Sequence, residues 1–219
     1  AIGVSRMARR RAIIRNLPAV ETLGSVTVIC SDKTGTLTQN QMTVQAITTG
    51  DTLLEVTGAG YEPQGQFLRA GEPVEPSSLP GVVEVLTAGL LCNESALVQA
   101  AGRFSAQGDP TEVALIVAAH KAGLVRADLE ARLPILDTIP FDSQHQYMAT
   151  LHDAGPGRPR IVYLKGAAEV LVERCTAAQN SRGHQTELDL DRVYLEVSQL
   201  AARGLRVLAF ARLELPSET

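Results

Sequence analysis

The residues best suited to chemistry form one short segment, Ser31 to Thr38, which reads SDKTGTLT. Asp32 carries a carboxylate that can attack the terminal phosphate of a nucleotide and form an aspartyl-phosphate. Lys33, the threonine hydroxyls and the flexible backbone at Gly35 are suited to holding phosphate oxygens. The segment therefore predicts phosphoryl transfer, and the alternative is an ordinary polar turn after a strand.

A buried strand should position Asp32. Residues 26–30 (VTVIC) form a short apolar, β-branched run, which is typical of a strand buried on both faces of a parallel sheet. An aspartate just beyond such a strand lies at the carboxyl edge, where α/β sheets bind their ligands. We expect a loop from there to about Asn40 and a second strand over residues 42–49.

Strands and helices are mixed along the rest of the chain. Residues 50–75 are rich in Gly, Pro and Glu, which predicts a hairpin region at a surface. Helices are expected over residues 82–92, 110–121, 166–174 and 188–203, and strands over residues 135–140, 147–152, 160–164 and 205–213. Strands joined by hairpin-length turns indicate an α+β domain, with an antiparallel sheet flanked by helices, over roughly residues 47–213.

Two of these helices have clear end signals. Asp109 is a good N-cap, Pro110 suits the first helical position, and Glu112 is placed to complete a capping box with Asp109. Gly204 is a natural C-cap for the helix over residues 188–203.

Composition argues against several classes of protein. The 219 residues, 45% of them hydrophobic, are enough for one large core or two modest ones. A net charge of −4 and a pI of about 5.6 argue against a nucleic-acid partner. Cys30, Cys92 and Cys175 lie far apart without CxxC spacing, which argues against a disulfide framework and against a thiolate zinc site.

The first 17 residues are expected to form a basic helix with five arginines. It could be a solvated helix face or a juxtamembrane segment on the cytoplasmic side of a membrane. No apolar run reaches the roughly 18 residues of a membrane span. The chain begins without Met or a signal-peptide pattern, and we expect it to be an excised fragment of a membrane protein.

The octapeptide SDKTGTLT resembles the phosphorylation signature of P-type cation-transporting ATPases. Residues 16–24 resemble the link between a membrane helix and the phosphorylation strand in the Ca²⁺- and Na⁺,K⁺-type branch. The resemblance implies that residues 1–46 are the first part of an α/β, haloacid-dehalogenase-like phosphorylation domain, incomplete here. Residues 47–213 would be a nucleotide-binding domain inserted into it, and residues 214–219 a hinge back.

This resemblance makes Asp32 the phosphorylated nucleophile, with Lys33 and Thr34 beside it. It implies a Mg²⁺ ion held by the Asp32 carboxylate and the Thr34 backbone carbonyl, with further ligands outside this chain. Soluble phosphatases of the wider superfamily carry a second aspartate where this chain has Thr34, so a plain phosphatase is disfavoured. A regulatory module that binds nucleotide without chemistry is the other alternative, and the intact Asp32 argues against it.

Four further motifs, GDPTE, PFDS, LKGA and GLRVLA, resemble the family's ATP pocket. They imply the nucleotide-binding residues Glu112, Phe141, Ser143, Lys165, Gly166 and Arg206. By resemblance, Glu112 lies on the adenine side, Phe141 stacks on adenine and Arg206 meets the phosphates. Lys165 is expected just before a helix, where free amides favour anions. Without the resemblance, a helix cap, a core Phe and a surface Lys would explain Glu112, Phe141 and Lys165.

One departure from the family pattern lies after Phe141. Many relatives have a Lys or Arg in this stretch, whereas this chain has Gln144, His145, Gln146 and Tyr147. The pocket lacks a permanent positive charge there, so we expect weaker triphosphate binding.

Together these features predict the ATP-binding, autophosphorylated part of an ATP-driven cation pump, with ATP and Mg²⁺ as cofactors. The heavy-metal branch carries a His-Pro pair that is absent here, which favours a calcium-type pump. The transported cation would bind membrane helices outside this chain, and the pump's actuator domain would be another partner. The parent protein is expected in the plasma membrane with this part on its cytoplasmic side. The fragment alone is expected to bind ATP with negligible turnover.

Overall fold

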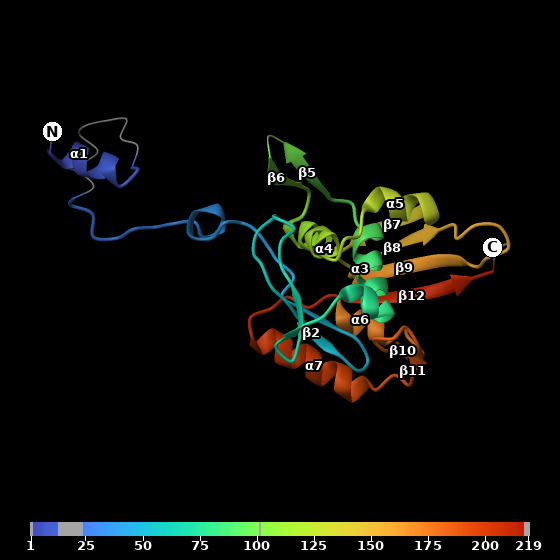
Figure 1. The fold of residues 1–219 in the computed structure, drawn as a ribbon. Coiled ribbons are helices and arrows are strands. Elements are labelled where there is room, and N and C mark those ends of the chain that lie inside the picture. Colours follow the sequence, from blue (N-terminus) through green and yellow to red (C-terminus); the bar gives the residue numbers. More distant parts are fainter. Residues whose placement is uncertain (1, 13–23, 101, 217–219) are drawn as a thin grey trace. The chain divides into compact units, whose positions relative to one another are not determined.

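The computed structural model describes residues 2–12, 24–100 and 102–216 (Figure 1). The chain divides into two compact units, Ala1–Asn40 and Gln41–Thr219. The first contains α1 (Ile2–Arg9) and a single π-helical turn, Lys33–Leu37. The basic helix predicted over residues 1–17 is α1, which ends at Arg9, and Arg11 takes a left-handed conformation, φ 62°, that a helix does not continue through. Residues 13–17 of this prediction lie outside the described ranges.

The predicted buried strand over residues 26–30 is wrong for this structure. These residues have no regular secondary structure, and Val28 and Ile29 are 74% and 84% exposed. A strand is stable only beside a hydrogen-bonded neighbour. The described part of Ala1–Asn40 contains no strand with which residues 26–30 could pair.

An antiparallel sheet organises the second unit. Its strand order is β12–β9–β8–β7, and every neighbouring pair is antiparallel. The strands are β7 (Ile135–Asp142), β8 (Tyr147–His152), β9 (Arg160–Gly166) and β12 (Ala209–Leu215). All four were predicted, although β7 and β9 are longer than expected and β12 begins four residues later, at Ala209 rather than Leu205.

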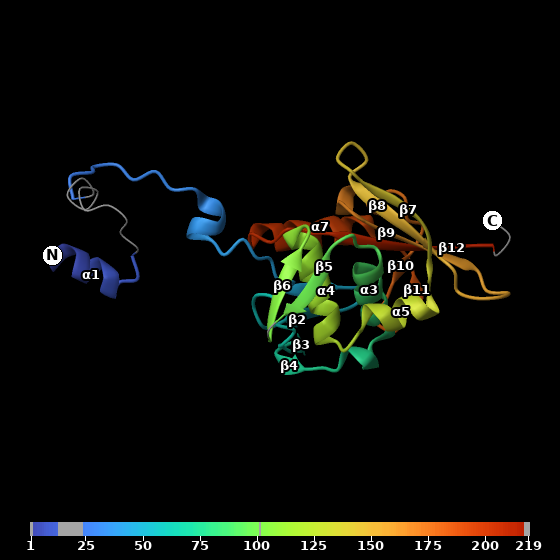
Figure 2. The same cartoon turned by 90° about the horizontal axis from the view of Figure 1, so that it is seen from above.

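Helices α3 (Pro80–Leu91) and α4 (Pro110–Lys121) pack on each other, and α3 also packs on β9. Figure 2 shows both helices on the same side of the sheet. The predicted bounds of α4 are confirmed at both ends. The helix α7 (Leu190–Ala202) ends as predicted before Gly204, whose φ of 77° is the left-handed conformation of a C-cap glycine.

Smaller elements complete the unit. A second antiparallel sheet joins β1 (Ala46–Thr48), the strand predicted over residues 42–49 but shorter, to three strands in the predicted hairpin region: β2 (Leu53–Val56), β3 (Phe67–Arg69) and β4 (Glu72–Pro73). Two further hairpins are β5 (Ala96–Ala100) with β6 (Arg103–Gln107) and β10 (Ala178–Gln179) with β11 (Gln185–Thr186). The remaining helices are α5 (Arg126–Arg132) and α6 (Ala168–Val172). The unit is therefore a mixed domain of helices and antiparallel sheets, as predicted.

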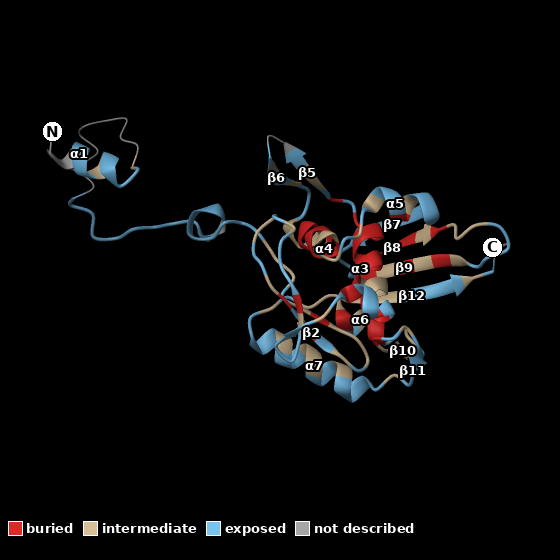
Figure 3. Cartoon of the chain, viewed as in Figure 1, coloured by how far each residue is buried: buried red, intermediate tan, exposed pale blue. Residues whose placement is uncertain are grey.

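The core lies between α3, α4 and the sheet, where buried side chains concentrate (Figure 3). Cys92 is fully buried there, and its Sγ lies 3.8 Å from the Met148 carbonyl oxygen and 3.7 Å from that of Tyr163. Burial raises the pKa of the Cys92 thiol to about 11, so it packs as a neutral side chain. Within the described ranges, no helix has the length and apolar character needed to cross a membrane.

Candidate functional site

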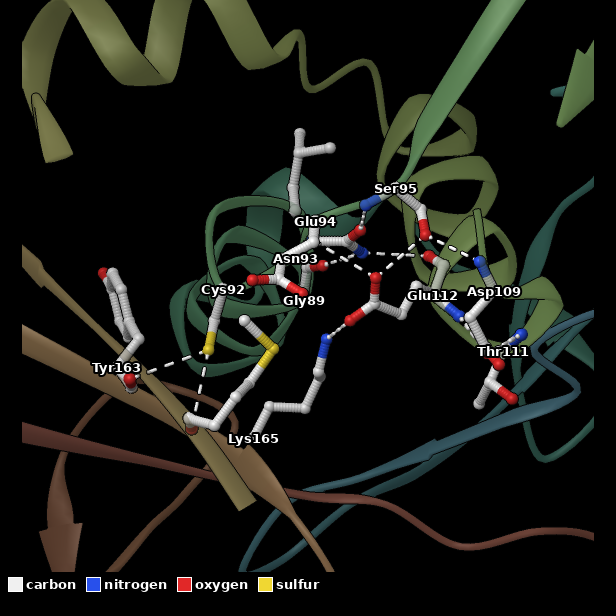
Figure 4. Close-up of polar contacts among 12 residues, drawn as sticks. Gly89, Cys92, Asn93, Glu94, Ser95, Asp109, Thr111, Glu112, Tyr163 and Lys165 are labelled. Carbon is white, nitrogen blue, oxygen red and sulfur yellow. Dashed lines mark hydrogen bonds and ion pairs between the residues drawn. The ribbon is translucent and has the colours of Figure 1, made fainter. Parts of the chain in front are cut away.

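Two of the predicted pocket residues, Glu112 and Lys165, form a buried ion pair (Figure 4). Strand alternation places Lys165 on the core face of β9, together with Tyr163 and Ile161. Its Nζ donates to Glu112 Oε1 at 2.5 Å, and the two side chains are only 6% and 16% exposed. Each charge compensates the other, which a buried charge requires.

Helix α4 presents Glu112 from its first turn. Asp109 is the N-cap, as predicted, and its Oδ1 accepts hydrogen bonds from the backbone amides of Thr111 (2.7 Å) and Glu112 (3.4 Å). Burial acts to raise the pKa of the Asp109 carboxyl, but these hydrogen bonds and the Arg206 charge outweigh it and lower the pKa.

Only half of the predicted capping box forms: Asp109 Oδ1 accepts from the Glu112 amide, but the Glu112 side chain does not accept from the Asp109 amide. The Asp109 amide donates instead to Ser95 Oγ at 3.0 Å, and Ser95 Oγ donates to Glu112 Oε2 at 2.8 Å (Figure 4). A serine from a distant segment thus stands between the Asp109 amide and the Glu112 carboxylate, where the second bond of the capping box would have been. This leaves Glu112 Oε1 for Lys165.

Arg206 also reaches the first turn of α4. Its Nη1 donates to Thr111 Oγ1 at 3.2 Å, one residue before Glu112 in the chain. The Arg206 side chain is exposed. The structure therefore brings Glu112, Lys165 and Arg206 to one place.

Phe141 lies on the edge strand β7, and its side chain is 58% exposed. The β7–β8 register is irregular between Ile139 and Asp142, which places Pro140 and Phe141 opposite Met148. Met148 is the register partner of Lys165 on β9. Phe141 on β7 is therefore in register with Lys165 on β9, with Met148 of β8 between them, and its ring is exposed. The alternative explanation of Phe141, a phenylalanine in the hydrophobic core, is therefore wrong.

Gly166 and Ser143 take different positions. Gly166 pairs with Tyr147, and a Cβ on it would lie 2.4 Å from the Gln146 carbonyl oxygen, so the close approach of β8 requires glycine. Ser143 lies in the exposed turn between β7 and β8. The helix expected after Lys165 is α6, whose five residues begin only at Ala168, so Lys165 is held by Glu112 rather than placed at a helix mouth.

Asp32, Lys33 and Thr34 belong to the other compact unit. The Asp32 side chain is exposed, and the π-helical turn after it closes through Lys33, whose carbonyl oxygen accepts from the Thr38 amide (3.1 Å) and hydroxyl (3.2 Å). A carboxylate and a carbonyl oxygen are ligands that Mg²⁺ prefers, so Asp32 and the Thr34 carbonyl suit it. The described residues contain no cluster of three or more His, Cys, Asp or Glu that could hold a metal.

The sequence analysis missed Asn93 and Ser95. Both are buried just after α3, and the Ser95 amide donates to Asn93 Oδ1 at 2.9 Å. Asn93 Nδ2 in turn donates to the carbonyl oxygens of Gly89 (3.0 Å) and Glu112 (2.9 Å). The available signal was a polar Asn-Glu-Ser triplet directly after a strongly apolar helix.

Comparison with known proteins gives a consistent result. The family model described as P-type ATPase, cytoplasmic domain N, matches residues 81–219. The chain is 50% identical over 217 residues to the cation-transporting ATPase pma1 of Synechocystis, covering 97% of this chain and 24% of that protein. It is 47% identical over 210 residues to the probable cation-transporting ATPase F of Mycobacterium tuberculosis, covering 95% and 23%. It is 37% identical over 220 residues to the calcium-transporting ATPase of Bacillus subtilis, covering 96% and 24%. The chain thus spans about a quarter of the length of these relatives.

Proposed function

The chain belongs to the P-type ATPase family, and from that premise we propose that it binds ATP for an ATP-driven cation pump and receives the terminal phosphate on Asp32. The observation that carries the proposal is the cluster of Glu112, Lys165 and Arg206, with the exposed ring of Phe141 aligned across the sheet. A carboxylate, two cations and an aromatic surface are the groups that an adenine nucleotide requires.

The base would be held by Phe141 and Glu112. An exposed aromatic ring offers a stacking surface for adenine. The Glu112 carboxylate accepts hydrogen bonds only, which suits the exocyclic amino group of adenine. Ser143 and Gly166 would line the same pocket, Gly166 through its backbone.

The phosphates would be held by Arg206. The charge of Lys165 is compensated by direct contact with Glu112, whereas the exposed Arg206 guanidinium donates to the neutral Thr111 hydroxyl and interacts with the Asp109 carboxylate through its charge. A guanidinium can bind phosphate oxygens through two parallel hydrogen bonds. Lys165 would then act mainly by fixing Glu112.

An Asp32 carboxylate oxygen would attack the terminal phosphorus of ATP, and the bond to the bridging oxygen would break to release ADP and leave an aspartyl-phosphate. Lys33 would contribute positive charge beside the transferred group. Mg²⁺, held by the Asp32 carboxylate and the Thr34 carbonyl, would neutralise charge on that group. Position 34 holds no carboxylate to activate water, so the phosphoenzyme would persist, as a pump requires and a phosphatase does not.

The wider assignment follows from the family. We assign residues 1–46 to a phosphorylation domain of the haloacid-dehalogenase type, 47–213 to the nucleotide-binding domain inserted into it, and 214–219 to the hinge. The transported cation would be calcium, because the chain is similar to calcium-transporting ATPases, and it would bind outside this chain. The actuator domain would be a further partner. The pump would lie in the plasma membrane with this part on the cytoplasmic side.

Titration of the 219-residue chain with ATP tests the proposal. We expect saturable amide NMR shifts centred on Glu112, Phe141, Lys165 and Arg206, with GTP and AMP binding more weakly than ATP. We also expect negligible steady ATP hydrolysis by the chain alone. Absence of saturable shifts would contradict the proposed nucleotide pocket. Robust hydrolysis would contradict the proposal that ATP turnover needs residues of the pump outside this chain.

Gln146→Lys should strengthen triphosphate binding several-fold. Gln146 is exposed in the turn between β7 and β8, and its backbone already adopts a φ of 59° that lysine tolerates as well as glutamine does. The added cation would attract ATP but have a smaller effect on AMP, and the gain should fall as salt is raised. Calorimetry on both nucleotides measures this, with Gln199→Lys on the exposed face of α7 as a charge-matched control. Unchanged ATP affinity would mean that the missing charge does not limit binding.

A further inference from the structure

We propose that Ser95 is a positioning residue that orients the Glu112 carboxylate toward the amino group of adenine. The inference rests on the proposed nucleotide pocket. Ser95 is 2% exposed, and its hydroxyl has two partners: it accepts from the Asp109 amide and donates to Glu112 Oε2 (Figure 4). One side chain therefore connects the helix cap with the carboxylate.

The position of Ser95 is itself fixed. Its amide donates to Asn93 Oδ1, and the Asn93 amide group spans from the end of α3 to the first turn of α4 by donating to Gly89 and Glu112 carbonyl oxygens. Asn93 is also buried. The serine hydroxyl is thus held in place by backbone and side-chain contacts on both helices.

Gly108 makes room for this hydroxyl. Its φ is 110°, and a Cβ at this position would lie 2.2 Å from Ser95 Oγ. A side chain at residue 108 would displace Ser95 or the chain that leads into Asp109. The glycine of the GDPTE motif therefore permits the contact between Ser95 and the start of α4.

The consequence for Glu112 follows from counting acceptor sites. An ionised carboxylate offers about four lone-pair sites. Three are filled, because Oε2 accepts from Ser95 Oγ and from the Glu94 amide (3.2 Å), and Oε1 accepts from Lys165 Nζ. The remaining lone-pair site, on Oε1, points in a fixed direction. A ligand can use it only if its hydrogen-bond donor lies along that direction. Loss of the Ser95 hydroxyl frees the carboxylate to rotate and blurs that selection.

The test compares ATP with purine riboside 5′-triphosphate, which has the same sugar and phosphates but lacks the amino group. Calorimetry or NMR titration of the 219-residue chain should show ATP binding about tenfold more tightly, the value of one hydrogen bond to a charged group. In Ser95→Ala the ratio should fall to about two, whereas Ser95→Thr, which keeps the hydroxyl, should retain most of it. Ser105→Ala, an exposed serine on β6, is the matched control and should leave the ratio unchanged.

The ratio of the two affinities distinguishes positioning from simple destabilisation, because loss of structure weakens the binding of both ligands equally. If Ser95→Ala does not fold, as judged by its amide spectrum, Ser95→Cys keeps the size with a weak donor and should give an intermediate ratio. A wild-type ratio near one, or an unchanged ratio in folded Ser95 variants, would overturn the inference while leaving ATP binding intact. No saturable binding of ATP by the wild-type chain would overturn the proposed function itself.

Discussion

Replacing Lys165 by methionine should destabilise the second unit by about 3 kcal/mol and abolish saturable ATP binding. The substitution keeps a side chain of similar length but leaves the Glu112 carboxylate largely buried without its cation. Removing one partner of a buried pair costs more than the pair itself contributes, because the remaining charge must be desolvated alone. Denaturant unfolding and ATP titration measure the two effects.

The double variant Glu112→Gln/Lys165→Met provides the internal control. It leaves no buried charge, so we expect it to recover part of the lost stability while ATP binding remains lost. Arg192→Met breaks an exposed pair with Glu196 on α7 and should change stability by less than about 1 kcal/mol. If Lys165→Met were as stable as the wild type, the pair would not be buried in solution as it is here.

Asp32→Asn, introduced into the full-length protein, should abolish phosphoenzyme formation from ATP labelled on its terminal phosphate. An amide is not a nucleophile that can form the acyl phosphate. The measurement is acid-stable label that hydroxylamine removes. Asp128→Asn on the exposed face of α5 is the control and should label normally.

The same substitution in the 219-residue chain should leave ATP affinity unchanged. Asp32 lies in the compact unit Ala1–Asn40, whereas Glu112, Lys165 and Arg206 lie in Gln41–Thr219. Binding and phosphoryl transfer would therefore be separable by mutation. Persistent hydroxylamine-sensitive label in the full-length Asp32→Asn protein would exclude Asp32 as the nucleophile.

Much of the second unit could be predicted from the sequence because its signals are local. Asp109 and Pro110 define the start of α4 through groups within one helical turn. The strands β7, β8 and β9 were visible as runs bounded by turn residues. Such signals do not depend on distant parts of the chain.

Elements that depend on distant or weak signals were missed or wrong. Residues 26–30 have the composition of a buried strand, but a strand needs a neighbour that composition cannot supply. The β5–β6 hairpin was missed because its Ala- and Gln-rich strands contain a single β-branched residue, Val98. The short helix α5 buries only Leu129 among its seven residues and so carries little periodicity.

The candidate site shows the same contrast between local signals, which could be read from the sequence, and distant contacts, which could not. Resemblance identified Glu112, Lys165 and Arg206, and the structure places them together. Nothing in the sequence indicated that Lys165 is buried, because lysine is among the residues least often buried in proteins. The capping box was a sound local inference and half of it forms, but Ser95, 17 residues before Glu112, replaces its second hydrogen bond by a tertiary contact. Local rules fail where a distant side chain offers a better partner.

The irregular edge of β7 has a consequence for solubility. An open strand that exposes Ile139 and Phe141 is a template on which a second chain could add and start aggregation. Pro140 has no amide hydrogen to donate to such a chain, and the two register shifts in β7 interrupt the regular spacing that it would need. The irregularity that exposes the Phe141 ring should thus also hinder the domain from pairing with copies of itself.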